Sequence, residues 1–135
     1  MFPGDLTTEV LTASLRGLNA RNTALANNIA NAETPGYKRV DVSFESALAD
    51  AVESDRSRLH RGDGALPAFS EQGREIDDFT PSVGSVDTTT MRVDGSNVDP
   101  DDEMAQLSAN TLAHQTVVSL LDKRFAQFRT AIMGR

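Results

Sequence analysis

Residues 25–37 read LANNIANAETPGY, and they join a heptad-patterned segment to an abrupt reversal of the chain. Asn27, Asn28 and Asn31 stand in the last turns of the expected helix, although asparagine is a mediocre helix former because its amide competes for backbone hydrogen bonds. The sequence TPGY at 34–37 then suits a type II turn, in which the glycine supplies a positive φ. The pattern predicts that a helix ends near Asn31 or Ala32, with either Asn31 or the glycine in the left-handed position beyond it.

The segment before this turn, from about Asp5 to Ala32, carries a heptad seam of the kind that packs against a partner helix. The members of this N-terminal seam are Leu11, Leu15, Leu18, Asn22, Leu25 and Ile29. Asn22 is its one polar member, either buried and fixing the register or solvated at the rim. Gly17 costs about 1 kcal/mol relative to alanine inside a helix. Its presence indicates either a close approach by another helix or a marginal helix.

The C-terminal segment has the clearest pattern in the chain. Asp99 suits the N-cap of a helix and Pro100 its first position, and the acidic residues that follow complement the helix dipole. A second seam then repeats without a break, and its members are Met104, Leu107, Thr111, His114, Val118, Leu121, Phe125, Phe128 and Ile132. A helix of this length would span roughly 45 Å.

The middle of the chain has weaker signals. Val40, Val42 and Phe44 alternate with polar residues, which predicts a short extended piece, and the spacing of apolar residues over 44–52 predicts a short amphipathic helix. That helix is expected to fade from about Asp55, with Ser43 as its N-cap.

Residues 62–99 are rich in glycine and proline, which favours an exposed loop. The short apolar pieces Val83–Val86 and Met91–Val93 are the candidates for a small β element within it.

These patterns predict a mainly α-helical chain. The two long heptad helices would form an antiparallel coiled-coil hairpin, with an irregular middle segment that holds a short helix and a small β element. We expect residues 1–37 together with 99–135 to form the helical module and 38–98 an intervening outer segment. Apolar residues also lie off both seams, at Val10, Val117 and Leu120, so we expect neighbouring subunits to cover them.

The charge is concentrated in one part of the chain. The 135 residues carry a net charge of −7, of which residues 62–103 contribute −9. A nucleic-acid binder would need a basic patch instead. Cysteine is absent, which excludes disulfides and thiol chemistry. Neither a cleaved Sec signal nor a membrane span is apparent in the sequence.

The sequence offers no constellation for catalysis, a metal or a cofactor. His60 is expected in a surface loop and His114 on the helix seam, so the two histidines lack metal-ligand spacing. The acidic run at 99–103 is explained by helix capping more simply than by a calcium site. We therefore predict that the protein is not an enzyme. A wall-degrading lysin, for example, would need a carboxylate pair in a folded cleft.

Two motifs in this sequence resemble those of bacterial flagellar rod and hook proteins. LANNIAN at 25–31 followed by TPGY at 34–37 is similar to the N-terminal signature of that family, and Arg21 fits the same pattern. DGSNVD at 94–99 followed by Glu103 and Met104 is similar to the start of its C-terminal helix, with Ser96 where asparagine is usual and His114 where an aromatic residue is usual. The signature residues are Asn27, Asn28, Ile29, Asn31, Thr34, Pro35, Gly36 and Tyr37.

The short length, the segment 44–48 and the ending AIMGR at 131–135 resemble one of the two proximal-rod proteins of this family rather than its sibling FlgC. The resemblance implies a structural subunit of the basal body. Such a subunit polymerises with other rod proteins into the proximal rod, which links the MS ring to the distal rod and transmits torque. The implied partners are FlgC, the adaptor FliE, further rod subunits and other copies of the same chain.

The resemblance also implies export through the flagellar type III apparatus to the periplasmic rod, without a Sec signal. Phe44 and Leu48 are similar to the short motif that the export gate recognises, and an ordinary amphipathic helix explains the same spacing. We interpret Asn27, Asn28 and Asn31 as hydrogen-bonding groups for contacts between subunits, with contacts to their own turn as the alternative. We expect the terminal helices to order on assembly. The alternative function is a secreted coiled-coil adaptor or effector, which would share the heptads but would not need the asparagine-rich signature.

Overall fold

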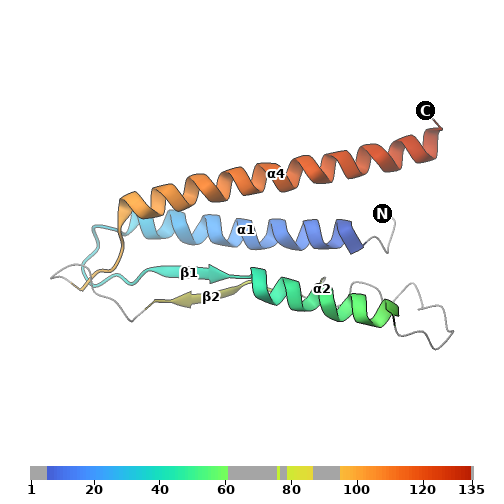
Figure 1. Cartoon of the computed structure of the whole chain (residues 1–135). Helices are drawn as coiled ribbons and strands as arrows, with labels where there is room; N and C mark the ends of the chain where they lie inside the picture. The colour runs from blue at the N-terminus through green and yellow to red at the C-terminus, as the bar shows by residue number, and fades with distance from the viewer. Residues whose placement is uncertain (1–5, 61–75, 77–78, 87–94, 135) are drawn as a thin grey trace.

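The computed structural model describes residues 6–60, 76, 79–86 and 95–134. Its helices and strands are α1 (Leu6–Ala30), β1 (Val40–Ser43), α2 (Glu45–His60), β2 (Ser82–Ser85) and α4 (Pro100–Met133). The predicted fold class is confirmed, because the two long terminal helices lie in antiparallel contact and the middle holds a short helix and a two-stranded sheet (Figure 1).

The helix α1 occupies the middle of three layers (Figure 1). On one side it packs against α4, and on the other it packs against β1 and α2. The strands β1 and β2 are antiparallel, with Val40 opposite Ser85 and Val42 opposite Val83.

The turn after α1 forms as the sequence predicts. The helix ends at Ala30, and the Tyr37 amide donates to the Thr34 carbonyl at 3.2 Å. Gly36 has a φ of 72°, the left-handed value that the third position of a type II turn requires. Since positive φ occurs only at glycines in the described part of the chain, Gly36 rather than Asn31 takes the left-handed position.

The apolar core lies between α1 and the β1–α2 layer, and not along the predicted seam between the two long helices. A stripe of small residues on α1 (Ala13, Gly17, Ala24) is buried against this layer, which allows large side chains to approach the helix closely. The buried core residues are Ala13, Leu18, Ala24, Val42, Phe44, Leu48 and Ile76.

Gly17 accommodates the ring of Phe44. A Cβ atom added at Gly17 would lie 2.4 Å from Cδ2 of that ring, which is too close for any real contact. The glycine therefore marks a close approach, but by an aromatic ring rather than by a second helix. Arg21, one turn further along α1, also contacts the ring, with its guanidinium carbon 4.7 Å from the ring centroid.

The N-terminal seam is only partly buried. Leu18 and Leu25 are buried, Leu11, Leu15 and Ile29 are half-buried, and Asn22 is exposed.

The face that α4 turns toward α1 differs from the predicted C-terminal seam. The described residues of α4 that are buried are Glu103 and Asn110, each one position before the predicted members Met104 and Thr111, which are exposed. Glu103 and Asn110 face α1 because their side chains bind Asn28, Arg39 and the Leu18 carbonyl. Leu107, His114, Val118, Leu121 and Phe128 remain half-buried, whereas Phe125 and Ile132 are exposed.

The middle segment corrects the expectations that its helix fades from Asp55 and that His60 lies in a loop. The helix α2 begins at Glu45 and continues to His60, so His60 ends a helix rather than lying in a loop. Val83 lies in β2, but Met91–Val93 lie outside the described residues. Ile76 is fully buried in the core, and its carbonyl accepts a hydrogen bond from Arg16 Nη2 at 2.8 Å.

We expect Gly17→Ala to lower the free energy of unfolding. Overpacking against Phe44 costs about 1–3 kcal/mol, and the gain in helix propensity returns only up to about 1 kcal/mol. Urea denaturation of the purified chain measures the change. The matched control is Gly84→Ala, where an added Cβ meets no atom within 4 Å. A variant at position 17 that is more stable than the parent would contradict the close approach.

Candidate functional site

Four side chains from three parts of the chain meet where α1, β1 and α4 converge. We call Asn28, Arg39, Asn97 and Glu103 the polar junction. Asn28 comes from the first sequence motif, Arg39 follows its turn, and Asn97 and Glu103 come from the second motif. Asn28, Asn97 and Glu103 are all more than nine-tenths buried. The two motifs are therefore brought together within one chain.

Asn28 is fully hydrogen-bonded inside the chain. Its Nδ2 donates to the Val40 carbonyl at 2.8 Å and to Glu103 Oε2 at 3.0 Å. Its Oδ1 accepts from the Val40 amide at 2.9 Å and from the Tyr37 hydroxyl at 3.3 Å. The amide thereby pairs with both backbone groups of Val40, as a neighbouring strand would, and holds β1 against α1.

Glu103 is a buried carboxylate that is neutralised by Arg39. Its side chain is 1 % exposed, and its Oε1 accepts from Arg39 Nε. Burial by itself lowers the pKa of Arg39, but the hydrogen bond and charge of Glu103 outweigh it, and the pKa lies above its ordinary value. Arg39 Nη2 also donates to Gln106 Oε1 at 3.0 Å, so one guanidinium clamps the first turns of α4.

Asn97 ties the segment before α4 to the sheet. Its Oδ1 accepts from the Arg39 amide at 2.7 Å, and its Nδ2 donates to the Val86 carbonyl. Lys38 Nζ donates to the Gly95 carbonyl at 3.0 Å beside it. The segment that leads into α4 is thus fixed beside the start of β1, which sets where α4 can begin.

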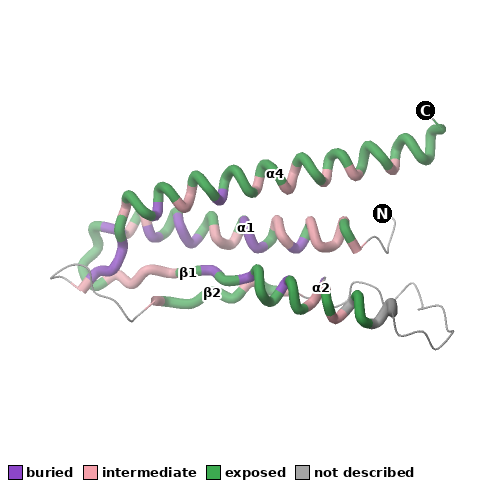
Figure 2. The backbone as a smooth tube through the Cα atoms, in the orientation of Figure 1, coloured by how far each residue is buried: buried purple, intermediate pink, exposed green. Residues whose placement is uncertain are grey.

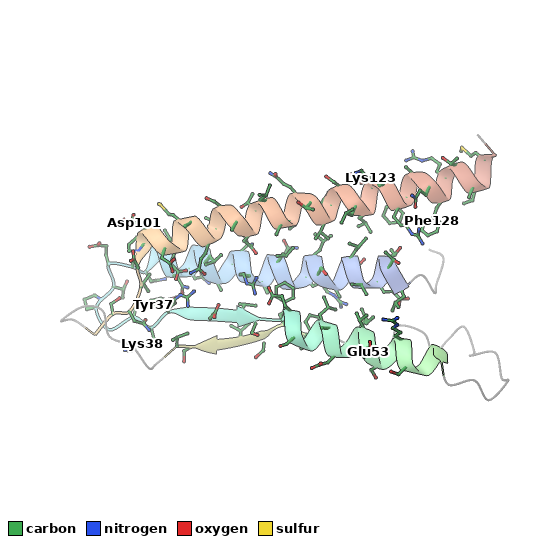
Figure 3. The ribbon with its side chains drawn as sticks, in the orientation of Figure 1. Tyr37, Lys38, Glu53, Asp101, Lys123 and Phe128 are labelled. Carbon is green, nitrogen blue, oxygen red and sulfur yellow. The ribbon has the colours of Figure 1, made fainter. Side chains whose placement is uncertain are left out.

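Glycines from the two motifs lie next to each other at this end of the molecule. Gly36 and Gly95 both have positive φ, and a Cβ added at Gly95 would lie 3.9 Å from Gly36 Cα. Figure 3 shows Tyr37, Lys38 and Asp101 gathered at the same end.

The start of α4 has the cap that its sequence favours. Asp99 is the N-cap, its Oδ1 accepts from the Asp101 amide at 3.0 Å, and Pro100 occupies the first position. Asp101, Asp102 and Glu103 follow in the first turn. Glu103 has a role beyond the helix dipole, however, because its carboxylate points inward to Arg39 and Asn28.

The signature asparagines have different environments. The interpretation that Asn28 contacts other subunits is wrong, because its amide is buried and saturated within the chain. Asn31 Nδ2 donates to the Asn27 carbonyl at 2.8 Å, so it closes the end of its own helix. Asn27 is exposed.

Sequence reasoning missed the junction roles of Arg39, Asn97 and Glu103. The second motif contained Asn97 and Glu103, but nothing in the spacing showed that they bind Arg39.

Phe44 and Leu48 lie in the apolar core, at 4 % and 7 % exposure. Beside them Arg21 pairs with Glu45 at 2.6 Å, and the hydrogen bond from Arg21 lowers the pKa of Glu45. Arg21 also donates to the Val42 carbonyl at 2.9 Å, so it connects α1 to both β1 and α2.

A groove of about 510 Å³ runs between β1 and the first half of α4, with α1 at its base. Leu18 and Arg21 line its base, Asp41 lines the β1 wall, and Ala109, Asn110 and Ala113 line the α4 wall. Asn110 is 6 % exposed, and its Nδ2 donates to the Leu18 carbonyl at 3.0 Å. Its Oδ1 has no hydrogen-bond partner. Most buried polar atoms are paired, so this orphaned acceptor is unusual.

Most of the length of α4 is exposed (Figure 2). Large apolar residues that are exposed along it are Met104, Leu112, Leu120, Phe125, Ile132 and Met133. A single chain therefore leaves much of α4 without an apolar partner.

Among the described residues, acidic, histidine and cysteine side chains form no cluster that could hold a metal ion. His114 is half-buried on α4. The described helices also include none with the length and apolarity needed to cross a membrane.

Comparison with known proteins identifies relatives across nearly the whole chain. Residues 11–38 match the family model described as flagella basal body rod protein. The flagellar basal body rod protein FlgB of Bacillus subtilis is 31 % identical over 134 residues, which cover 99 % of this chain and 97 % of the relative. The protein of the same name from Cereibacter sphaeroides is 36 % identical over 84 % of each chain, and that from Escherichia coli is 35 % identical over 75 % of this chain and 74 % of the relative.

We expect Arg39→Met to lower the free energy of unfolding by about 3–5 kcal/mol, because it leaves the buried Glu103 carboxylate without its cation. The double variant Arg39→Met with Glu103→Gln removes the charge and keeps an acceptor for Asn28. It should therefore be more stable than Arg39→Met alone.

Urea denaturation of the parent, the two single variants and the double variant measures this coupling. Lys123→Met, on an exposed part of α4, controls for the loss of a cation from the surface. Additive effects in the double variant would contradict the buried pairing.

Proposed function

The chain belongs to the FlgB family of flagellar basal body rod proteins, and on this basis we propose that it assembles into the proximal rod, linking the MS ring to the distal rod and transmitting torque. Membership makes it a structural component of the rod rather than an enzyme. The observation that carries the proposal is the extent of the relationship, which covers both long helices and the segment between them.

The exposed surface of α4 supports assembly with other subunits. Several large apolar side chains on this helix are exposed to water. A stable monomer would ordinarily bury such side chains. We propose that the covering partners are other rod subunits, namely FlgC, the adaptor FliE, further rod proteins and copies of this chain. Contacts between different surfaces of neighbouring subunits generate open helical stacks, as a rod requires.

The proposed route to the periplasmic part of the rod is the flagellar type III apparatus. If the export gate reads Phe44 and Leu48, it must read them in an unfolded chain, because both side chains are buried in the core of the folded one. A fold stabilised by a small core would favour this route, since it costs little to unfold.

The division into a helical module (1–37 with 99–135) and an outer segment (38–98) stays a prediction. The strand β1 and the start of α2 share one core with α1, so the outer segment would be anchored to the module where it begins. The alternative of a secreted coiled-coil adaptor lacks an equivalent reason for the buried junction between the two motifs.

We expect Gly36→Val to abolish swimming when it replaces the parent gene in a flagellated host. Position 36 has a φ of 72°, a conformation that costs an L-residue roughly 1–2 kcal/mol and disfavours a β-branched side chain most. An added Cβ meets no atom within 4 Å, so the effect would come from the backbone alone.

The matched control is Gly36→Asn, since asparagine adopts the left-handed region more readily and should retain motility. Soft-agar spreading, the level of the protein and its presence in isolated basal bodies are the measurements. Normal motility of the valine variant would contradict the role of the turn.

We also expect a gradient of hydrogen exchange along α4 in the dilute, purified chain. The amides of β1 and of α1 from Ala13 to Asn28 should be protected, because these elements surround the core. Protection in α4 should fall beyond Val117, the last residue of this helix that packs on the core. Strong protection throughout α4 at low concentration would contradict ordering on assembly.

A further inference from the structure

The helix α4 is joined to the rest of the chain mainly through polar groups. Its buried residues are Glu103 and Asn110, so none of its apolar side chains is buried. Val117 is the residue of α4 that packs on the apolar core, and it is only partly buried. The elements α1, β1 and α2, by contrast, share a core of buried apolar side chains. The core is therefore built almost without α4.

The contacts that hold the core elements together do not involve α4. Asn28 binds both backbone groups of Val40, at 2.8 Å and 2.9 Å, and so holds β1 to α1. Arg21 donates to the Val42 carbonyl at 2.9 Å from the same helix. Neither contact requires Glu103, so we expect α1, β1 and α2 to keep their arrangement when α4 leaves.

The segment before α4 supplies a fixed pivot for this helix. Asn97 accepts from the Arg39 amide at 2.7 Å, which fixes the segment beside the start of β1. Val98 is 2 % exposed, whereas the next residue, Asp99, is exposed. A change of backbone direction between these two residues would free α4 while the segment before it stays in place.

We propose that α4 is a strap that detaches from the folded core of α1, β1 and α2 as one unit, and that Glu103 is the latch that holds it. Its carboxylate binds both Asn28 and Arg39. Without it, α4 keeps Asn110 and its half-buried apolar contacts. The Arg39 side chain is 20 % exposed and can turn to water.

A detachable α4 opens the seam of α1 to a second helix. In the closed chain this seam is covered by the chain's own α4, and in the open chain a neighbouring subunit can compete for it. This use of the strap rests on the proposed rod function, whereas the detachment itself is a property of the single chain.

Thiol labelling at two adjacent positions of α1 tests the strap, because the chain has no cysteine of its own. Leu25 is 3 % exposed and lies outside the apolar core, between Leu18 and Asn28, to which α4 binds. Ala24 is 6 % exposed and belongs to the apolar core. A cysteine at position 25 therefore reports detachment of α4, and a cysteine at position 24 reports opening of the core.

Leu25→Cys and Ala24→Cys are each combined with Glu103→Ala, and the rate of reaction with a soluble disulfide reagent is measured on dilute purified protein. We expect the rate at position 25 to rise about 10- to 100-fold, as for the loss of hydrogen bonds to a charged group. The rate at position 24 should stay at its parental value. Asp102→Ala is the matched control, because it removes an exposed carboxylate from the same turn of α4 and should change neither rate.

Equal acceleration at both positions would show that the core opens together with α4, and would overturn the proposal. An unchanged rate at position 25, or the same rise with Asp102→Ala, would overturn the role of Glu103 as the latch. The thiol at position 24 also shows whether the Glu103→Ala chain remains folded. Because no other rod component is present, the outcome is independent of the motility assay that tests the rod function.

Discussion

The buried carboxylate of Glu103 is the constraint on which the arrangement of the three layers depends. A carboxylate at 1 % exposure needs a cation and further donors, and Arg39 and Asn28 supply them from beyond the end of α1 and from within it. Meeting this need fixes the rotation of α4 and the position of the start of β1. A pair of this kind contributes less to stability than to specificity, because desolvation offsets much of its attraction. We infer that this pair favours one register for two helices whose apolar seams would allow several.

The apolar and polar contacts are divided between the two faces of α1. Small residues on one face admit Phe44, Val42 and Leu48 to a compact core, whereas the other face meets α4 partly through Asn110 and the polar junction. The helix α4 is consequently attached firmly at its start and weakly toward its end (Figure 2). For a rod subunit this division is useful, because the chain can hold its own fold while it leaves a long helix surface for neighbours.

Local patterns predicted the helices, the turn and the strands well. Capping by Asp99 and Pro100, the positive φ at Gly36 and the period-two pattern at 40–44 depend on neighbours in sequence. The seam of α4 was predicted one position off at Met104 and Thr111, because a heptad count weighs apolar side chains and ignores a buried glutamate. The location of the core was also missed, although the small residues Ala13, Gly17 and Ala24 contained the signal.

By itself the sequence determined the elements, their order and the family, since these depend on local preference and on two long motifs. Only the tertiary structure decided what the motifs do. It paired Asn28 with Val40 and Glu103, and Asn97 with Arg39, across as many as 75 positions of sequence. Asn28, which looked like a contact for other subunits, belongs instead to an internal junction. The reason is physical: a buried amide or carboxylate must be satisfied by whichever groups the fold brings within reach, and spacing along the chain does not reveal those groups.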